Sequence, residues 1–285
     1  MTKFTTALLT GSALLLFTAC GGGSGGDAGT PAKTMVSITD ENADDVISAS
    51  VQSVSGITDI GDILLGDGSA NIAKSTSHLN TLGNIASANL EPGTLAESGT
   101  ESCSEGGSVS YDGNENTGGT VTFNECTEYG MTIDGTMVLS INGADTTTNF
   151  TNFSVKAYDS EVFYSSATMD LNTDTYDMSV TATGYAVDDG SRYDFENYSL
   201  IKTGNSYTFA GFVKTDCMGG WIEIKTNQAL VMYDSCPTAG DIVAIGNNSE
   251  LRMVFNSDMS VDVTVNGEAY HTYTSCDDLP EEVCK

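Results

Sequence analysis

The stretch Thr136-Met137-Val138-Leu139-Ser140-Ile141-Asn142-Gly143 decides the fold class of this chain. Residues 136–141 are rich in β-branched and apolar side chains, a composition that favours an extended strand. Asn142-Gly143 then supplies the residue pair of a tight hairpin turn. A strand that ends in such a turn predicts an antiparallel partner directly after it in the sequence.

The same pattern recurs from about Gly107 to the end of the chain. Val261, Val263 and Val265, for example, alternate with polar residues, so one side of that strand is dry and the other wet. Further strands are predicted at residues 120–123, 153–158, 176–185, 193–201, 207–214, 221–225, 229–233 and 251–255, with turns at 134–135, 189–190, 204–205, 246–247 and 266–267. Because no helix intervenes, we predict a mainly β domain over residues 101–285, an antiparallel meander curled into a barrel, a half-barrel or a sandwich.

A helical N-terminal segment is predicted over residues 35–100. Thr39 or Asp40 can cap a first helix, whose apolar residues recur at helical spacing and which Gly56 ends. The residues on its apolar side are Val46, Ile47, Val51 and Val54. A second helix is predicted from about Ile72 to Leu90.

Residues 1–19 have the layout of a secretory signal peptide. Lys3 gives the start a positive charge, an apolar run covers residues 7–17, and small residues follow at 18 and 19. The apolar run is too short to span a bilayer, which needs about 20 residues.

Phe17-Thr18-Ala19-Cys20 resembles the lipobox of bacterial lipoproteins, with Phe17 where leucine is usual. The resemblance implies cleavage before Cys20, acylation of its thiol by a chain such as palmitate, and acylation of the new amino terminus. Gly21, rather than aspartate, after the cysteine implies sorting to the outer membrane. The segment of residues 38–46, ITDENADDV, resembles the opening of uncharacterised β-rich lipoproteins from proteobacteria. Residues 20–34, which directly follow the expected cleavage site and are rich in glycine, are predicted to form a flexible tether.

The charge is strongly negative, with 39 acidic residues against 10 basic ones and a formal net charge of −29. Such a surface repels nucleic acid, so we expect no nucleic-acid partner. The expected partners are the membrane, through the anchor on Cys20, and a protein or an apolar small molecule.

Six cysteines remain beyond Cys20, an even number that indicates disulfides in an exported protein. Proximity in the sequence favours three local pairs: Cys103–Cys126, Cys217–Cys236 and Cys276–Cys284. Six cysteines allow 15 connectivities, so the pairing rests on proximity alone.

No catalytic constellation is recognisable, and no catalytic residue is assigned. The best candidate for ligand chemistry is a calcium loop, because Asp112, Asn114 and Asn116 place oxygen donors at alternate positions. Thr117 and Phe123 depart from the EF-hand pattern, and the alternative is a plain hairpin loop between strands near Val109 and Val121. Trp221, beside Cys217, is expected to fill the core.

These observations favour a noncatalytic envelope lipoprotein that serves as a structural or interaction module. One alternative is a carrier that holds an apolar ligand in a curved sheet. Another is a calcium-dependent adhesion module.

Overall fold

The computed structural model describes residues 33–52, 98–114, 117–128, 130–157, 160–188, 191–233 and 236–280. The chain divides into two compact units, residues 1–32 and 33–285. Every described residue belongs to the second unit. The predicted signal peptide, Cys20 and the second predicted helix lie outside the described residues.

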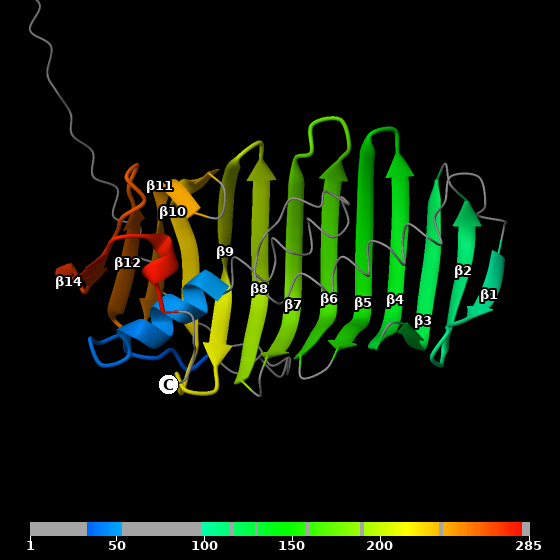
Figure 1. Ribbon diagram of the computed structural model, residues 1–285, viewed down its shortest axis with the longest axis horizontal. Helices are drawn as coiled ribbons and strands as arrows, with labels where there is room; N and C mark the ends of the chain where they lie inside the picture. The colour runs from blue at the N-terminus through cyan, green and yellow to red at the C-terminus, as the bar shows by residue number, and fades with distance from the viewer. Residues whose placement is uncertain are drawn as a thin grey trace, which may run out of the picture. The chain divides into compact units, whose positions relative to one another are not determined.

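One antiparallel sheet of 14 strands dominates the second unit, and the strands follow one another in the sheet in the order of the sequence (Figure 1). Each strand therefore pairs with its neighbours in the chain, as the predicted meander requires. The strands are β1 (Ser98–Ser102), β2 (Ser108–Asn114), β3 (Gly118–Glu128), β4 (Met131–Asn142), β5 (Asp145–Ala157), β6 (Ser160–Asn172), β7 (Met178–Asp188), β8 (Ser191–Thr203), β9 (Ser206–Thr215), β10 (Ile222–Tyr233), β11 (Cys236–Gly246), β12 (Ser249–Phe255), β13 (Val261–Val265) and β14 (Glu268–Tyr273). A short 3₁₀ helix, η1 (Cys276–Asp278), follows β14.

The sheet is not closed into a barrel, because its first and last strands, β1 and β14, do not pair with each other. The mainly β meander is thus confirmed, and the closed barrel, one of the three predicted arrangements, is wrong. Short turns join each strand to the next one, and nothing in such a chain of hairpins requires the two ends of the sheet to meet.

The two faces of the sheet differ as the period-two sequence pattern predicts. In β13, Val261, Val263 and Val265 are buried, whereas Asp262 is exposed. We call the side that carries the buried residues the inner face and the opposite side the outer face. The inner face supplies one continuous hydrophobic core that includes Phe123, Ile133, Met137, Phe150, Met169, Val180, Leu200, Phe209, Ile224, Leu251 and Val263.

A line of β-bulges crosses the sheet from β3 to β8. The registers shift at nearly the same level in adjacent strands, after Phe123 in β3, after Asp134 in β4 and after Glu196 in β8. Gly135 lies in this line with φ +113°, so the predicted turn at Asp134-Gly135 is a bulge inside β4 and that prediction is wrong. Asp-Gly satisfies the positive φ that either a turn or a bulge requires.

Before the first strand in the sequence, the described residues contain one helix, which covers residues 43–52. The first helical hydrogen bond runs from the Val46 N–H to the Asn42 carbonyl, 3.1 Å away. Asn42 therefore occupies the capping position, and the prediction of Thr39 or Asp40 is wrong. The reason is local, because the Asn42 Oδ1 accepts the Thr39 N–H at 2.8 Å and closes a turn before the helix begins.

The helix packs against the inner face with the apolar side that its spacing predicts, of which Val54 lies outside the described residues. Val46 and Ile47 are fully buried, and Val51 packs against the same core. Tyr193 of β8 donates to the Ala49 carbonyl at 3.2 Å. Among the described residues, no helix combines the length and apolar character needed to cross a membrane.

The predicted boundary between helical and β segments, at residue 100, falls inside β1, which begins at Ser98. Most of the predicted helical segment, residues 53–97, lies outside the described residues.

Candidate functional site

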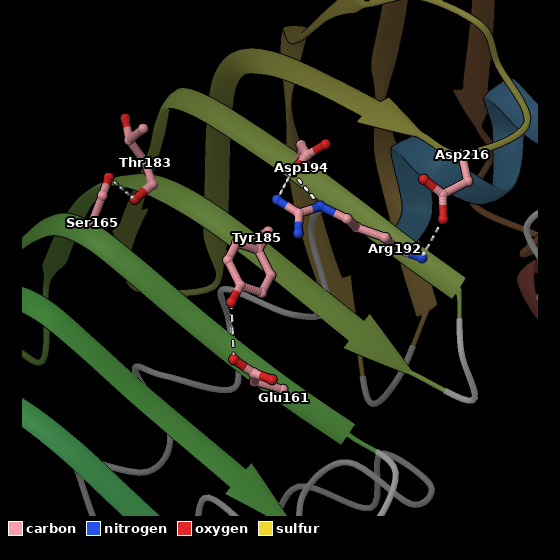
Figure 2. A network of polar contacts seen from close by, with 7 residues as sticks. All are labelled: Glu161, Ser165, Thr183, Tyr185, Arg192, Asp194 and Asp216. Atoms are coloured by element: carbon pink, nitrogen blue, oxygen red, sulfur yellow. Dashed lines mark hydrogen bonds and ion pairs between the residues drawn. The ribbon is translucent and has the colours of Figure 1, made fainter.

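The outer face of β6 to β9 carries a cluster built around Tyr185 (Figure 2). The ring of Phe163 in β6 stacks on that of Tyr185 in β7, with centroids 5.2 Å apart and an interplanar angle of 30°. On Tyr185, the guanidinium carbon of Arg192 lies 3.9 Å from the ring centroid. Stacked aromatic rings and a cation over a ring face are each attractive arrangements. We call these residues, with Glu161, Asp194 and Asp216, the Tyr185 cluster.

Strand pairing brings these side chains together. Phe163 is opposite Tyr185, and Tyr185 is opposite Asp194 on β8. Arg192 precedes Asp194 by two residues, so both project from the same face of β8. The cluster is therefore a direct product of register, since its members come from β6, β7 and β8, with Asp216 just after the end of β9.

Hydrogen bonds fix the polar ends of the cluster, as Figure 2 shows. The Tyr185 hydroxyl donates to Glu161 Oε1 at 2.9 Å. This bond raises the pKa of Tyr185, and burial and the charge of Glu161 add to the increase. Tyr185 is therefore a neutral hydrogen-bond donor near neutral pH.

Arg192 is held by two carboxylates from different places in the chain. Its Nε and one terminal nitrogen donate to Asp194 Oδ1 at 2.9 and 2.7 Å, and this interaction raises the pKa of Arg192. The Arg192 backbone N–H donates to Asp216 Oδ2 at 3.3 Å. The guanidinium is thus kept over the Tyr185 ring, although Arg192 itself is exposed.

A second cluster adjoins the first and centres on Lys33, the first described residue. Lys33 Nζ lies 2.6 Å from Glu196 Oε1 of β8. The same nitrogen is 4.8 Å from the ring centroid of Phe212 in β9 and 5.3 Å from that of Trp221. We call these four residues the Lys33 cluster.

Backbone hydrogen bonds hold Lys33 in place. The Trp221 N–H donates to the Thr34 carbonyl at 2.8 Å, and the Val36 N–H donates to the Trp221 carbonyl at 3.0 Å. Asn247 donates to the Val36 carbonyl at 2.6 Å. We call residues 33–36 the strap, because this segment attaches the N-terminal side of the chain to the sheet at Trp221.

Trp221 is half-buried and does not belong to the hydrophobic core. The prediction that it fills the core is therefore wrong. Ile222 and Ile224 take the inner-face positions at this point of β10, and a residue next to Ile222 points to the other side of the strand.

The two clusters share one side of the sheet. They present aromatic rings, a neutral phenol and both signs of charge on a face that the core does not use. Sequence reasoning did not find them, because their residues are scattered from Lys33 to Trp221. One signal was available, namely that basic residues are few and that several fall on strands beside aromatic residues.

Of the calcium candidates, Asp112 and Asn114 lie on β2, opposite Thr120 and Gly118 of β3. Asp112 is exposed, and Asn116 lies outside the described residues. The pairing confirms a hairpin between strands that contain Val109 and Val121. Binding of calcium there stays a prediction.

The disulfides agree in part with the predicted local pairs. Cys103 is joined to Cys126, as predicted, with Cα atoms 5.5 Å apart. Cys236 is joined to Cys276, with Cα atoms 5.9 Å apart, so the predicted pairs Cys217–Cys236 and Cys276–Cys284 are wrong. Cys217 also takes part in a disulfide, and Cys284 lies outside the described residues.

The error in pairing has a structural cause. Cys236 opens β11, and the chain returns to β11 at η1 after three more strands, which brings Cys276 beside it. Cys236 and Cys276 are 40 residues apart in the sequence, so proximity along the chain does not predict that they are close in space. In the described part of the chain, one group of three side chains lies close enough together to hold a metal ion, namely Cys236, Cys276 and Asp277. Its two sulfur atoms, however, are bonded to each other.

Comparison with known proteins finds no match among protein-family models, curated proteins or solved structures.

Proposed function

We propose that this chain is an exported envelope lipoprotein of the bacterial outer membrane, anchored by acyl chains on Cys20, whose sheet serves as a noncatalytic interaction module. The resemblance of residues 17–20 to a lipobox supports the anchor. The two cysteine pairs at disulfide distance are consistent with an oxidising compartment outside the cytoplasm.

The observation that carries the interaction role is the position of the Tyr185 and Lys33 clusters on the outer face. The inner face uses its apolar side chains for the core, which leaves the outer face to meet a partner. Aromatic residues and arginine are the types most enriched where proteins bind partners. Because the apolar side chains of the inner face form the core, an interaction module on the outer face is favoured over a carrier that holds an apolar ligand on the inner face.

For the sheet itself we propose an open single layer, the half-barrel of the predicted arrangements. Hydrogen-bonded pairing that continues through all 14 strands supports one layer. The bulge line supports curvature, because a bulge bends the strand that contains it.

The anchor is tested by mass spectrometry of the chain purified from the membranes of a Gram-negative host. We expect a mature amino terminus at Cys20 that carries the mass of acyl chains, and a Cys20→Ser variant that lacks them. An unprocessed start, or an unmodified Cys20, would refute the anchor. Turnover of an envelope substrate by the purified mature chain would refute the noncatalytic role.

A further inference from the structure

The Tyr185 and Lys33 clusters lie beside the point where the tether joins the sheet. We propose that this part of the outer face rests on the phospholipid surface to which the chain is anchored. The inference builds on the proposed function, since it supplies the partner of the outer face. We include Lys214 of β9 and Glu223 and Lys225 of β10, and call the whole set the membrane patch.

The covalent path from the anchor supports this placement. The strap binds Trp221, so the chain that starts at Cys20 reaches the sheet next to the Lys33 cluster. Lys33 follows Cys20 by 13 positions, with 12 residues between them. A glycine-rich coil of that length spans about 20 Å on average, and a fully extended one at most about 45 Å. The anchor therefore keeps the membrane patch close to the bilayer.

The charges of the membrane patch suit phospholipid headgroups. In a chain with only 10 basic residues, Lys33, Arg192, Lys214 and Lys225 gather here. Acidic residues alternate with them, namely Glu161, Asp194, Glu196, Asp216 and Glu223. Zwitterionic headgroups present a phosphate and an amine, and a patch of mixed sign can bind both. A net charge of −29 makes the rest of the surface unfavourable against phosphates.

Two of these lysines are available for phosphates. Lys33, by contrast, is paired with Glu196, and Arg192 is paired with Asp194. Within the described ranges, neither Lys214 nor Lys225 forms an ion pair. Both are half-buried, and a lysine in that setting can lay its aliphatic stem on the protein while its ammonium group stays in water.

The aromatic residues of the patch also fit a membrane surface. Tryptophan and tyrosine are enriched at the level of the headgroups, where one part of the ring is dry and another is wet. Trp221, Tyr185 and Phe212 are all half-buried on this part of the sheet. A phospholipid surface can contact both the aromatic rings and the charged groups of the membrane patch.

Trp221 provides a direct test, because it is the only tryptophan of the chain. The mature chain is ligated through its amino-terminal Cys20 to a lipid thioester, so that attachment does not depend on acylation in the cell. It is then bound to vesicles of phosphatidylethanolamine and phosphatidylcholine that carry a headgroup quencher. We expect roughly a twofold loss of Trp221 emission relative to vesicles without the quencher, since the ring would lie at headgroup level.

A relocated tryptophan supplies the matched control. Trp221→Phe combined with Val138→Trp moves the fluorophore to an exposed site on the outer face of β4. That site is six strands away from β10, about 29 Å at the usual strand spacing. We expect little quenching there. Equal quenching at both sites, or none at Trp221, would overturn the proposal.

Charge reversal tests the role of the two unpaired lysines. We expect Lys214→Glu with Lys225→Glu to remove most of the Trp221 quenching, whereas Ser140→Glu, at an exposed position on the outer face of β4, leaves it unchanged. Circular dichroism confirms that each variant is folded. Quenching that arises only in vesicles that also contain lipopolysaccharide would overturn the proposal and indicate a glycan partner. Because attachment is chemical, failure of the cellular anchor would not change these results.

Discussion

Asp241 is a carboxylate on the outer side of β11 whose side chain is only 2% exposed. Burial alone would raise its pKa, but hydrogen bonds from Arg252, Asn227 and the Gln228 N–H outweigh burial and lower it. Arg252 Nε lies 3.0 Å from Asp241 Oδ2, and the Gln228 N–H lies 2.9 Å from Oδ1. A single carboxylate thus joins β10, β11 and β12.

We expect Asp241→Asn to lower the free energy of unfolding by about 1–3 kcal/mol, because charge-assisted hydrogen bonds are lost while the site stays buried. Arg252 is 41% exposed, so solvent screens its interaction with Asp241, and we expect a value in the lower half of that range. Urea unfolding at neutral pH measures the change. Glu268→Gln, an exposed position on β14, serves as the control and should shift stability by less than about 0.5 kcal/mol.

The sign of the pH effect follows from the lowered pKa of Asp241. Its stabilising contribution is present above the ordinary value of 3.8 and is lost as pH falls through the lower pKa of the folded state. The destabilisation by Asp241→Asn should therefore shrink toward acid pH. A difference between the two proteins that stays constant down to pH 2 would contradict this account.

At the scale of elements, one carboxylate attaches the helix of residues 43–52 to β14. Asp44 Oδ1 accepts hydrogen bonds from the hydroxyls of Tyr270 and Tyr273, at 3.1 and 3.3 Å. Burial, the charge of Asp44 and these bonds raise the pKa of Tyr273 to about 12. The stabilisation that Tyr273 provides is complete below its ordinary pKa of 10 and is lost as pH rises through about 12.

Alkaline titration of tyrosinate absorbance tests the link between the helix and β14. We expect Asp44→Asn to move the highest tyrosine transition down toward 10, because the charge that opposes deprotonation is gone. Asp45→Asn changes the adjacent carboxylate and is the control. If Asp44→Asn leaves the titration unchanged, Asp44 does not hold the two phenols.

The bulge line makes a prediction for β4. A Cβ at Gly135 would lie 2.3 Å from the Asn152 carbonyl oxygen, and its φ of +113° is strained for any side chain. We expect Gly135→Ala to cost at least about 2 kcal/mol by thermal or urea unfolding. Gly143→Ala, at φ +64° with open space around the new Cβ, should cost only about 1 kcal/mol. Equal costs would show that the backbone at the bulge yields easily.

Much of the element level could be predicted from the sequence, because period-two patterns and Asn-Gly turns act locally. The turns at 142–143 and 266–267 are confirmed between β4 and β5 and between β13 and β14. Residues 221–225 and 229–233, predicted as two strands, fall in the single strand β10, which begins one residue later at Ile222 and is interrupted by register shifts. An Asp-Gly pair suits a bulge as well as a turn, so the two structures can be distinguished only by how the neighbouring strand pairs with these residues.

The candidate site lay beyond such local signals. Tyr185 meets Arg192 and Glu161 only because β6, β7 and β8 adopt one particular register, and a slip of one residue would send them to opposite faces. Lys33 meets Trp221 across 188 positions of sequence through backbone bonds of the strap. Composition and spacing hold no information on such contacts.

At the scale of the whole molecule, the net charge of −29 dominates the electrostatics. The described residues form three ion pairs, Lys33–Glu196, Arg192–Asp194 and Arg252–Asp241, and these leave the net charge unchanged. Repulsion between like charges destabilises a compact state, and salt screens that repulsion.

We therefore expect stability to rise with salt, by on the order of 1 kcal/mol between about 0.01 and 0.5 M sodium chloride. Urea unfolding of the mature chain at pH 7 at each salt concentration measures the trend. Potassium chloride should act equally, because the effect is screening rather than specific binding. A decrease in stability with salt would show that attractive ion pairs outweigh the repulsion.

The sequential order of the sheet has a consequence for how the protein acquires its structure. Since each strand pairs with the one just before it, the chain can add hairpins one after another without waiting for distant partners. Within the ranges that the structure describes, the strap and the helix of residues 43–52 must find partners made much later, at Trp221 and β14. We therefore expect docking of this segment to be the final event of assembly, because it needs a sheet that is already complete.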